Sequence, residues 1–154
     1  MKSEHINPFL VGVKNIFQDV AQMSLASNGI SVKTSPTASK NVVVMLGLTG
    51  DLRGTIAMNL DEELTKKIAS NMMGGMPVLE LDELSKSAIS ELCNMIMGTV
   101  CTLFAEQQLS VDITPPSLMT GQNIHLSFTQ TPVMSVKFGY EEHEIDLDLS
   151  IVEK

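Results

Sequence analysis

One amphipathic segment, residues 82–108, places the strongest constraint on how this chain of 154 residues folds. Asp82 precedes it and is a suitable N-cap, because its carboxylate can accept a hydrogen bond from a free backbone N–H of the first helical turn. Apolar residues recur with the three-and-four spacing of a helix that buries one side, at Leu84, Ala88, Leu92, Met95, Ile96, Val100 and Leu103. The sequence therefore predicts a long helix with one stripe packed on a core.

The opposite side of this helix carries an unusual set of side chains. At about 100° per residue, Ser87, Glu91 and Asn94 fall on one narrow strip, which Gly98 continues. After Lys86 the helix has only two more charged residues, Glu91 and Glu106. A polar triplet followed by a small residue favours close approach of another protein surface. An ordinary solvated face is the alternative interpretation.

The strip also resembles a known motif. Ser87-x-x-x-Glu91-x-x-Asn94, followed by Met95-Ile96-Met97-Gly98, is similar to the signature of the chemotaxis phosphatases that include CheX, CheC and FliY. That signature is Ser or Asp, three residues, Glu, two residues and Asn on a long helix. The order of elements before the helix also resembles the family: a strand hairpin, then a helix ended by a glycine pair. The resemblance covers roughly residues 8–152, and the chain is identified as a CheX-like member.

The resemblance implies a function and roles for four residues. A CheX-like protein hydrolyses the aspartyl phosphate of a CheY-like receiver domain, with Asn94 orienting the attacking water and Glu91 anchoring the receiver through its lysine. Ser87 and Gly98 would contact the same partner. No cofactor of the chain's own is expected, since the Mg²⁺ of that reaction belongs to the receiver. The alternative is a non-catalytic module that docks a receiver domain or a flagellar switch component; a purely structural oligomer fits the bare helix face poorly.

Composition excludes several other classes of protein. The net charge of −8 and the pI near 4.7 argue against a nucleic-acid partner. With 44% hydrophobic and 18% charged residues, the sequence predicts one globular domain over residues 1–154. No apolar run approaches the ~20 residues of a membrane span, so membrane insertion is not expected. Cys93 and Cys101 lie two turns apart on one helix, too far for a disulfide, and reduced thiols without an export signal suggest the cytoplasm.

Metal chemistry finds no support in residue spacing. His5, His125 and His143 are scattered, and none has a second ligand at the spacing of a metal motif. The acidic pair Glu141-Glu142 is interpreted as solvated surface. No metal site is therefore expected.

A first helix is predicted from an N-cap at Asn7 and Pro8 in the first turn to a stop at Asn28-Gly29. Its outer face carries Asn15, Asp19 and Gln22, which repeat the spacing of the triplet at 87, 91 and 94. Asp19 is one methylene shorter than Glu91, and Gln22 is one methylene longer than Asn94. We interpret this set as a relic of duplication on a solvated face, without activity.

The remaining sequence predicts strands at residues 30–34, 42–48, 53–60, 111–114, 123–131, 133–140 and 143–152, with a helix from Asp61 to the pair Gly74-Gly75. Residues 42–48 form an almost continuous apolar run, typical of a strand buried on both faces, and the last strand alternates cleanly. Residues 115–121 are expected to be a flexible stretch in which an edge strand or an exchanged segment could be accommodated. In the last strand, Ile145, Leu147, Leu149 and Ile151 are predicted to point inward, and Asp146, Asp148 and Ser150 outward. The fold class is α+β: a pseudo-symmetric duplication of helix–strand units, with an antiparallel sheet and two long helices alongside.

A homodimer is expected through strands. A long, cleanly alternating C-terminal strand with an unprotected edge would pair with a second copy, and residues 115–121 would give slack for a strand to cross. Such a dimer would leave Glu91 and Asn94 exposed on each subunit.

Overall fold

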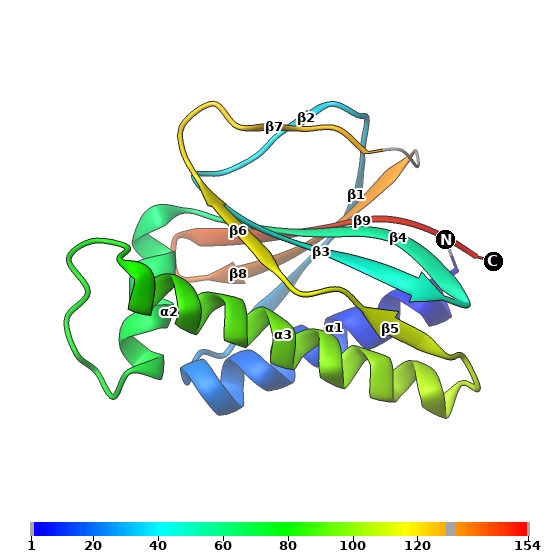
Figure 1. Ribbon diagram of the computed structural model, residues 1–154, viewed down its shortest axis with the longest axis horizontal. Helices are drawn as coiled ribbons and strands as arrows, with labels where there is room; N and C mark the ends of the chain where they lie inside the picture. The colour runs from blue at the N-terminus through cyan, green and yellow to red at the C-terminus, as the bar shows by residue number, and fades with distance from the viewer. Residues whose placement is uncertain (1, 129–131, 154) are drawn as a thin grey trace.

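A computed structural model describes residues 2–128 and 132–153, and it has the α+β architecture predicted from the sequence. One antiparallel sheet has helices on one side, and a small two-stranded sheet lies over its other side (Figure 1). The helices are α1 (Ser3–Ala21), α2 (Glu62–Met72) and α3 (Glu83–Glu106). The strands are β1 (Ala26–Lys33), β2 (Thr37–Ala38), β3 (Val42–Gly50), β4 (Leu52–Leu60), β5 (Val111–Ile113), β6 (Ser117–Thr120), β7 (His125–Leu126), β8 (Val133–Tyr140) and β9 (His143–Glu153).

The strand order displays the predicted duplication. In the described residues the main sheet runs β1-β8-β9-β4-β3-β5, with β6 also paired to β3. Each half of the chain begins with a long helix and an edge strand, β1 or β5, and ends in a hairpin, β3–β4 or β8–β9. The edge strand of one half pairs with the hairpin of the other, and β4 meets β9 at the centre. A pseudo-two-fold axis between β4 and β9 therefore relates the strands of one half of the chain to those of the other.

The main core fills the space between the helices and the sheet. Four phenylalanines from both halves are completely buried there: Phe9, Phe17, Phe104 and Phe138. The helices α1 and α3 approach closely at Gly12, where an added Cβ would lie 2.9 Å from Val100 Cγ2 and 3.3 Å from the carbonyl oxygen of Ile96. This contact holds the site-bearing helix against its counterpart from the first half.

The opposite face of the sheet is buried over most of β9, which corrects the prediction for the last strand. Asp146, Asp148 and Ser150 of β9 do point away from the helices, but they are 8%, 0% and 1% exposed. Lys33 from β1 lies across them, with its Nζ 3.1 Å from Asp146 Oδ2 and 3.1 Å from Asp148 Oδ1. Alternation correctly placed the two faces, but it could not show that a lysine from a distant strand covers the polar one.

Another part of that face lies under the small β2–β7 sheet (Figure 1). A second apolar cluster lies beneath it, formed by Val43, Ala57, Leu126, Phe128 and Val133. The predicted strand over residues 123–131 is therefore wrong in extent: only His125–Leu126 pairs, and residues 129–131 lie outside the described part. The stretch at 115–121 contains a strand, β6, which pairs with β3 of the same chain.

The boundaries of the first helix were misplaced at both ends. The helix α1 begins at Ser3, so Pro8 lies inside it and leaves the carbonyl of Glu4 without its usual donor. The side-chain Nε2 of Gln107, at the end of α3, donates to that carbonyl at 2.9 Å. The helix ends at Ala21 because Gln22 turns into the left-handed region with φ 52°. Gly29, with φ 90°, instead lies at an irregularity in β1.

The basis of the expected dimer is also corrected. The last strand, β9, is interior, since it pairs with β8 on one side and β4 on the other. It therefore has no free edge for a second copy. Within the described residues the edge strands of the main sheet are β1 on one side and β5 and β6 on the other.

Candidate functional site

The helix α3 begins as predicted from Asp82. The Asp82 carboxylate accepts the Ser85 N–H at 2.9 Å, and the Ser85 hydroxyl accepts the Asp82 N–H at 3.3 Å, forming a reciprocal capping box. Hydrogen bonds from the side chain and backbone of Ser85 hold the pKa of Asp82 below its ordinary value. The cap fixes the first turn of the helix and therefore the rotation of the strip that follows.

The buried face of α3 differs by part of a turn from the predicted stripe. The fully buried members are Ile89, Leu92, Cys93, Ile96, Met97, Val100 and Phe104. Ser85 is buried, whereas Leu84 is 65% exposed and lies one turn before Ser87 on the outer strip. The capping box explains the difference, because it turns Ser85 toward the protein and Leu84 away from it.

The predicted site residues lie together on the outer face. Ser87, Glu91, Asn94 and Gly98 are all exposed. Within the described chain, no hydrogen bond or ion pair engages the side chains of Ser87, Glu91 or Asn94. Gly98 has no atom within 4 Å of the position that a Cβ would take. These four residues are called the α3 strip from here on. The polar side chains of the strip are free to bind an external partner.

A groove accompanies the strip. It is lined by Glu83, Lys86, Ser87, Ser90, Glu91, Asn94, Pro116 and Leu118. Lys86 and Ser90 flank the triplet on the same helix, so their positions in the sequence could have indicated them. Pro116 and Leu118 gave no such signal, because the pairing of β6 with β3 brings them there. Ser87, Glu91 and Asn94 thus line a groove whose other side is formed by residues 116 and 118, outside α3.

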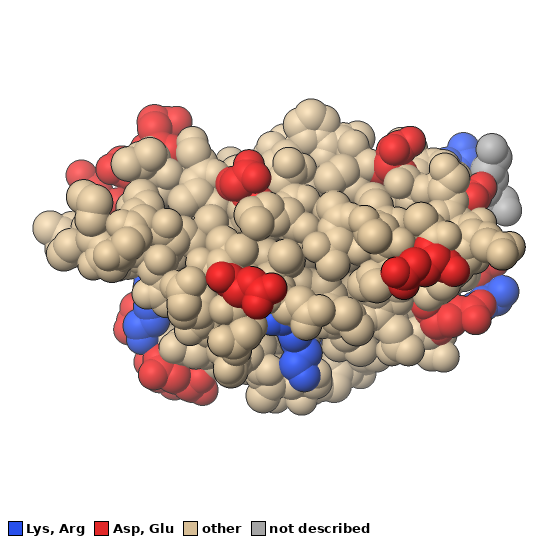
Figure 2. All heavy atoms as spheres, turned by 90° about the horizontal axis from the view of Figure 1, so that it is seen from below, with Lys and Arg blue, Asp and Glu red and all other residues tan. Residues whose placement is uncertain are grey.

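The face around the groove is poor in charge. Figure 2 shows the side of the molecule that carries α1 and α3, where carboxylates stand as separate groups among mostly uncharged side chains. Few basic side chains appear on it. The groove itself is lined by two carboxylates, Glu83 and Glu91, and one lysine, Lys86, so its charge balance is negative, which suits a partner that presents a cation.

Comparison with known proteins identifies the family. The model of the family "Chemotaxis phosphatase CheX" matches residues 42–139, well over half of the chain. The chain belongs to this CheX family. It is 30% identical over 151 residues to the CheY-P phosphatase CheX of Thermotoga maritima, covering 98% of this chain and 97% of that protein.

Solved structures agree with the fold of this CheX-family chain. A crystal structure of CheX from Desulfovibrio desulfuricans has a TM-score of 0.88 at 22% identity, covering 98% of this chain and 99% of the other. The complex of CheX with CheY, BeF₃ and Mg²⁺ from Borrelia burgdorferi has a TM-score of 0.78 at 25% identity, covering 97% and 98%. These likenesses establish the architecture that presents α3.

The corresponding set on α1 does not form a second strip of the same kind. Asn15 and Asp19 are exposed, but Gln22 lies beyond the end of the helix. Its Nε2 turns back to the carbonyl of Val20 at 3.2 Å. The repeated spacing in the sequence therefore places only two of the three residues on a helical face.

The cysteines of α3 do not offer a nucleophile. Cys93 is buried, and burial raises the pKa of its thiol to about 12. Burial, followed by the charge of Asp112, also raises the pKa of Cys101. Since the thiolate is the reactive form, both residues remain thiols near neutral pH. Both are free, as their spacing predicted.

The helix α3 is, by length and composition, also apolar enough to cross a membrane, the one such helix in the described chain. The sequence prediction that no segment approaches a span therefore did not anticipate this helix. Its apolar side is packed in the main core against α1 and the sheet. We interpret it as the core helix of the domain.

Proposed function

We propose that this chain hydrolyses the aspartyl phosphate of a CheY-like receiver domain, with the α3 strip as its catalytic surface. The observation that carries the proposal is the exposure, on one helix face, of a carboxamide and a carboxylate that no described residue of the chain engages. The relationship to a CheY-P phosphatase and the fold shared with a CheX solved in complex with CheY support the choice of substrate.

In this proposal Asn94 orients the attacking water. An acyl phosphate is already reactive and needs no strong base; it lacks a water held in line with the breaking P–O bond. A carboxamide offers one acceptor and two donor hydrogens, so it can fix both the position and the orientation of that water. Positioning of this kind is the main protein contribution to phosphoryl transfer. The Mg²⁺ would come with the receiver, as in the complex that contains CheY and Mg²⁺.

Glu91 anchors the receiver, one turn away from Asn94 on the same strip. Its carboxylate is free to accept a charge-assisted hydrogen bond from a lysine of the partner. Ser87 adds a polar contact one turn earlier, and Gly98 lets the partner backbone come close to α3. Because the proposed partner is a receiver domain of two-component signalling, we place the chain in the cytoplasm.

The test of this function is the decay of a phosphorylated receiver domain with and without the chain. A receiver from the same cell is phosphorylated with acetyl phosphate and the released phosphate is followed over time. Catalytic acceleration at sub-stoichiometric amounts of the chain supports hydrolysis. Binding without acceleration identifies the alternative, a docking module that uses the same strip.

Glu91→Ala is expected to weaken binding of the phosphorylated receiver by about 1.5–3 kcal/mol, the usual value of a hydrogen bond to a charged group. The rate at saturating receiver should change less, because the carboxylate anchors the partner and does not touch the water. Titration calorimetry with a stably activated receiver measures the affinity. Glu106→Ala, an exposed carboxylate near the end of the same helix, is the matched control. Equal affinities of Glu91→Ala and the parent would contradict the anchor.

Gly98→Ala is expected to separate stability from binding. A Cβ at this position meets nothing inside the chain, and alanine favours a helix interior over glycine by about 0.5–1 kcal/mol, so the free protein should become more stable. The same methyl group would lie between α3 and the receiver and weaken binding. Thermal unfolding and calorimetry measure the two effects. Unchanged binding would remove Gly98 from the proposed interface.

We also propose a homodimer, now through an edge strand instead of the interior strand β9. The support is β1, an end strand whose Ile30 and Val32 are 46% and 61% exposed. Exposed apolar groups on an unpaired edge favour addition of a strand from a second copy. Sedimentation at micromolar concentration measures the mass, and a value near the monomer mass of 16.7 kDa would contradict the dimer.

A further inference from the structure

His143 begins β9 and is held by the N-cap of α2. Asp61 Oδ1 accepts the Leu64 N–H at 2.7 Å, which caps the helix, while Asp61 Oδ2 lies 2.8 Å from His143 Nδ1. An ionised carboxylate only accepts hydrogen bonds, so Nδ1 must carry the proton. The other ring nitrogen, Nε2, then has its lone pair available in the neutral imidazole.

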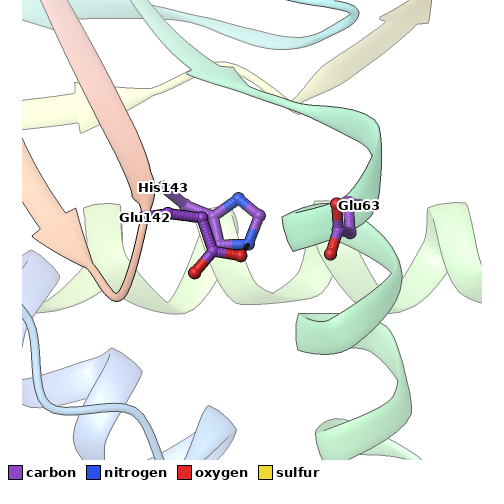
Figure 3. Close-up of side chains that lie close together, drawn as sticks. All are labelled: Glu63, Glu142 and His143. Carbon is purple, nitrogen blue, oxygen red and sulfur yellow. Dashed lines mark ion pairs between the residues drawn. The ribbon is translucent and has the colours of Figure 1, made fainter.

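That free nitrogen faces two more acceptors. The ligand atoms of His143, Glu142 and Glu63 all lie within 4.8 Å of one another. Figure 3 shows Glu142 and His143 on the side of the β8–β9 turn, with Glu63 opposite them on the first turn of α2. The His143 side chain is 5% exposed, and its buried Nε2 has no hydrogen-bond partner in the described structure, although Glu142 Oε1 lies 3.3 Å away. Three groups with lone pairs at this distance from one another can hold a cation between them.

The neighbouring lysines do not supply that cation. Lys67 Nζ lies 2.8 Å from Glu141 Oε1, and Lys66 Nζ lies 3.8 Å from Glu62 Oε1. Each lysine therefore pairs with the acid next to a member of the cluster. Among the described residues, Glu63 has no ion pair and Glu142 has only His143.

We propose that Glu63, Glu142 and His143 bind a divalent transition metal ion such as Zn²⁺, with His143 Nε2 and one oxygen of each carboxylate as ligands. Imidazole and carboxylate donors suit Zn²⁺, and water completes its four-coordinate shell. Asp61 then has the role common around metal-bound histidines, because a carboxylate on the second nitrogen fixes the tautomer and the ring orientation.

The geometry needs only a small adjustment to hold an ion. Tetrahedral ligands at about 2.0–2.1 Å from zinc lie roughly 3.3–3.5 Å apart, somewhat closer than the present limit of 4.8 Å. Glu63 and Glu142 are exposed and free to rotate inward, whereas the histidine is already fixed. The bound ion would join the β8–β9 turn to the start of α2. The contact between Asp61 and His143 already links these two segments, across 82 positions of sequence.

The test is calorimetric titration of the metal-free full chain with ZnCl₂ near pH 7.5. The expected result is one ion per chain with micromolar affinity, together with a higher midpoint of thermal unfolding as zinc is added, because a ligand that binds only the folded state stabilises it. Glu63→Gln and Glu142→Gln should each weaken binding at least tenfold. Both changes are at exposed positions and keep the fold, and His143→Gln should abolish binding.

Three variants serve as matched controls. Glu62→Gln changes the exposed acid next to Glu63, His125→Gln changes an exposed histidine elsewhere, and Cys101→Ser removes the partly exposed thiol. All three should leave the zinc affinity unchanged. Absence of saturable binding at about 100 μM Zn²⁺, or binding that Glu63→Gln and Glu142→Gln leave intact, would overturn the proposal.

Discussion

Asn94→Ala is expected to remove the catalytic acceleration while leaving the fold and the affinity for the receiver nearly intact. Asn94 is exposed and makes no hydrogen bond with the described part of the chain, so its truncation costs no internal contact. In the proposed mechanism its amide alone fixes the water. Loss of one such positioning or stabilising group commonly lowers the rate by about 10²–10³. Single-turnover decay of the phosphorylated receiver measures the rate.

The control for this change comes from the first half of the chain. Asn15 is also an exposed asparagine on a long helix, and Asp19 lies one turn after it. Asn15→Ala and Asp19→Ala should leave the rate close to that of the parent. Full activity of a well-folded Asn94→Ala protein would contradict the mechanism. Loss of activity in the α1 variants instead would assign catalysis to the other helix.

The position of the strip could be predicted because it depends on local rules. Helical periodicity placed Ser87, Glu91 and Asn94 on one face, and the structure exposes all three. The rotation of the buried stripe was harder to predict: Leu84 fits an apolar pattern, but the capping box buries Ser85 instead. An N-cap thus determined which of two neighbouring residues entered the core.

The errors in the sequence prediction come from contacts between distant segments. The sequence placed Pro8 in the first turn, because a proline inside a helix leaves one backbone carbonyl without a donor. In the structure Gln107, at the end of α3, donates to that carbonyl, so α1 can begin before Pro8. Likewise, no spacing rule could join Glu63 with Glu142 and His143. Fold class and strip followed from periodicity, whereas helix limits and polar clusters required the tertiary structure.

The polar face of β9 carries the largest expected effect on stability. Asp148 is completely buried, and Lys33 supplies the positive charge beside it while Asn59 Nδ2 donates a hydrogen bond at 3.0 Å. Lys33→Ala would leave a buried carboxylate with the amide alone. Removing one partner of a buried ion pair costs about 3–5 kcal/mol, a large part of the total of about 5–15 kcal/mol for a domain. Equilibrium denaturation with urea measures the loss.

The pH dependence of this cluster has a definite sign. Burial raises the pKa of Asp146, but hydrogen bonds and charges from Lys33 and Lys137 outweigh it and hold the pKa below its ordinary value. A carboxyl whose pKa is lowered by folding adds stability above its unfolded pKa and loses it as pH falls through the folded one. Burial lowers the pKa of Lys33, but Asp148 and Asp146 outweigh burial and raise it, so the contribution of Lys33 persists until strongly alkaline pH. The parent should therefore lose this stability in acid, and again only at strongly alkaline pH where Lys33 deprotonates.

A second substitution separates loss of charge pairing from loss of packing. In Lys33→Ala/Asp148→Asn the buried group is neutral, and its amide oxygen can still accept from Asn59, so part of the lost stability should return. Lys67→Ala removes a lysine from the exposed pair with Glu141 and should change stability far less, because surface ion pairs contribute little. If Lys33→Ala were as mild as Lys67→Ala, the ion pair would not stabilise this face. If the double variant were as unstable as Lys33→Ala, the lysine would act by covering the sheet with its alkyl chain and not by its charge.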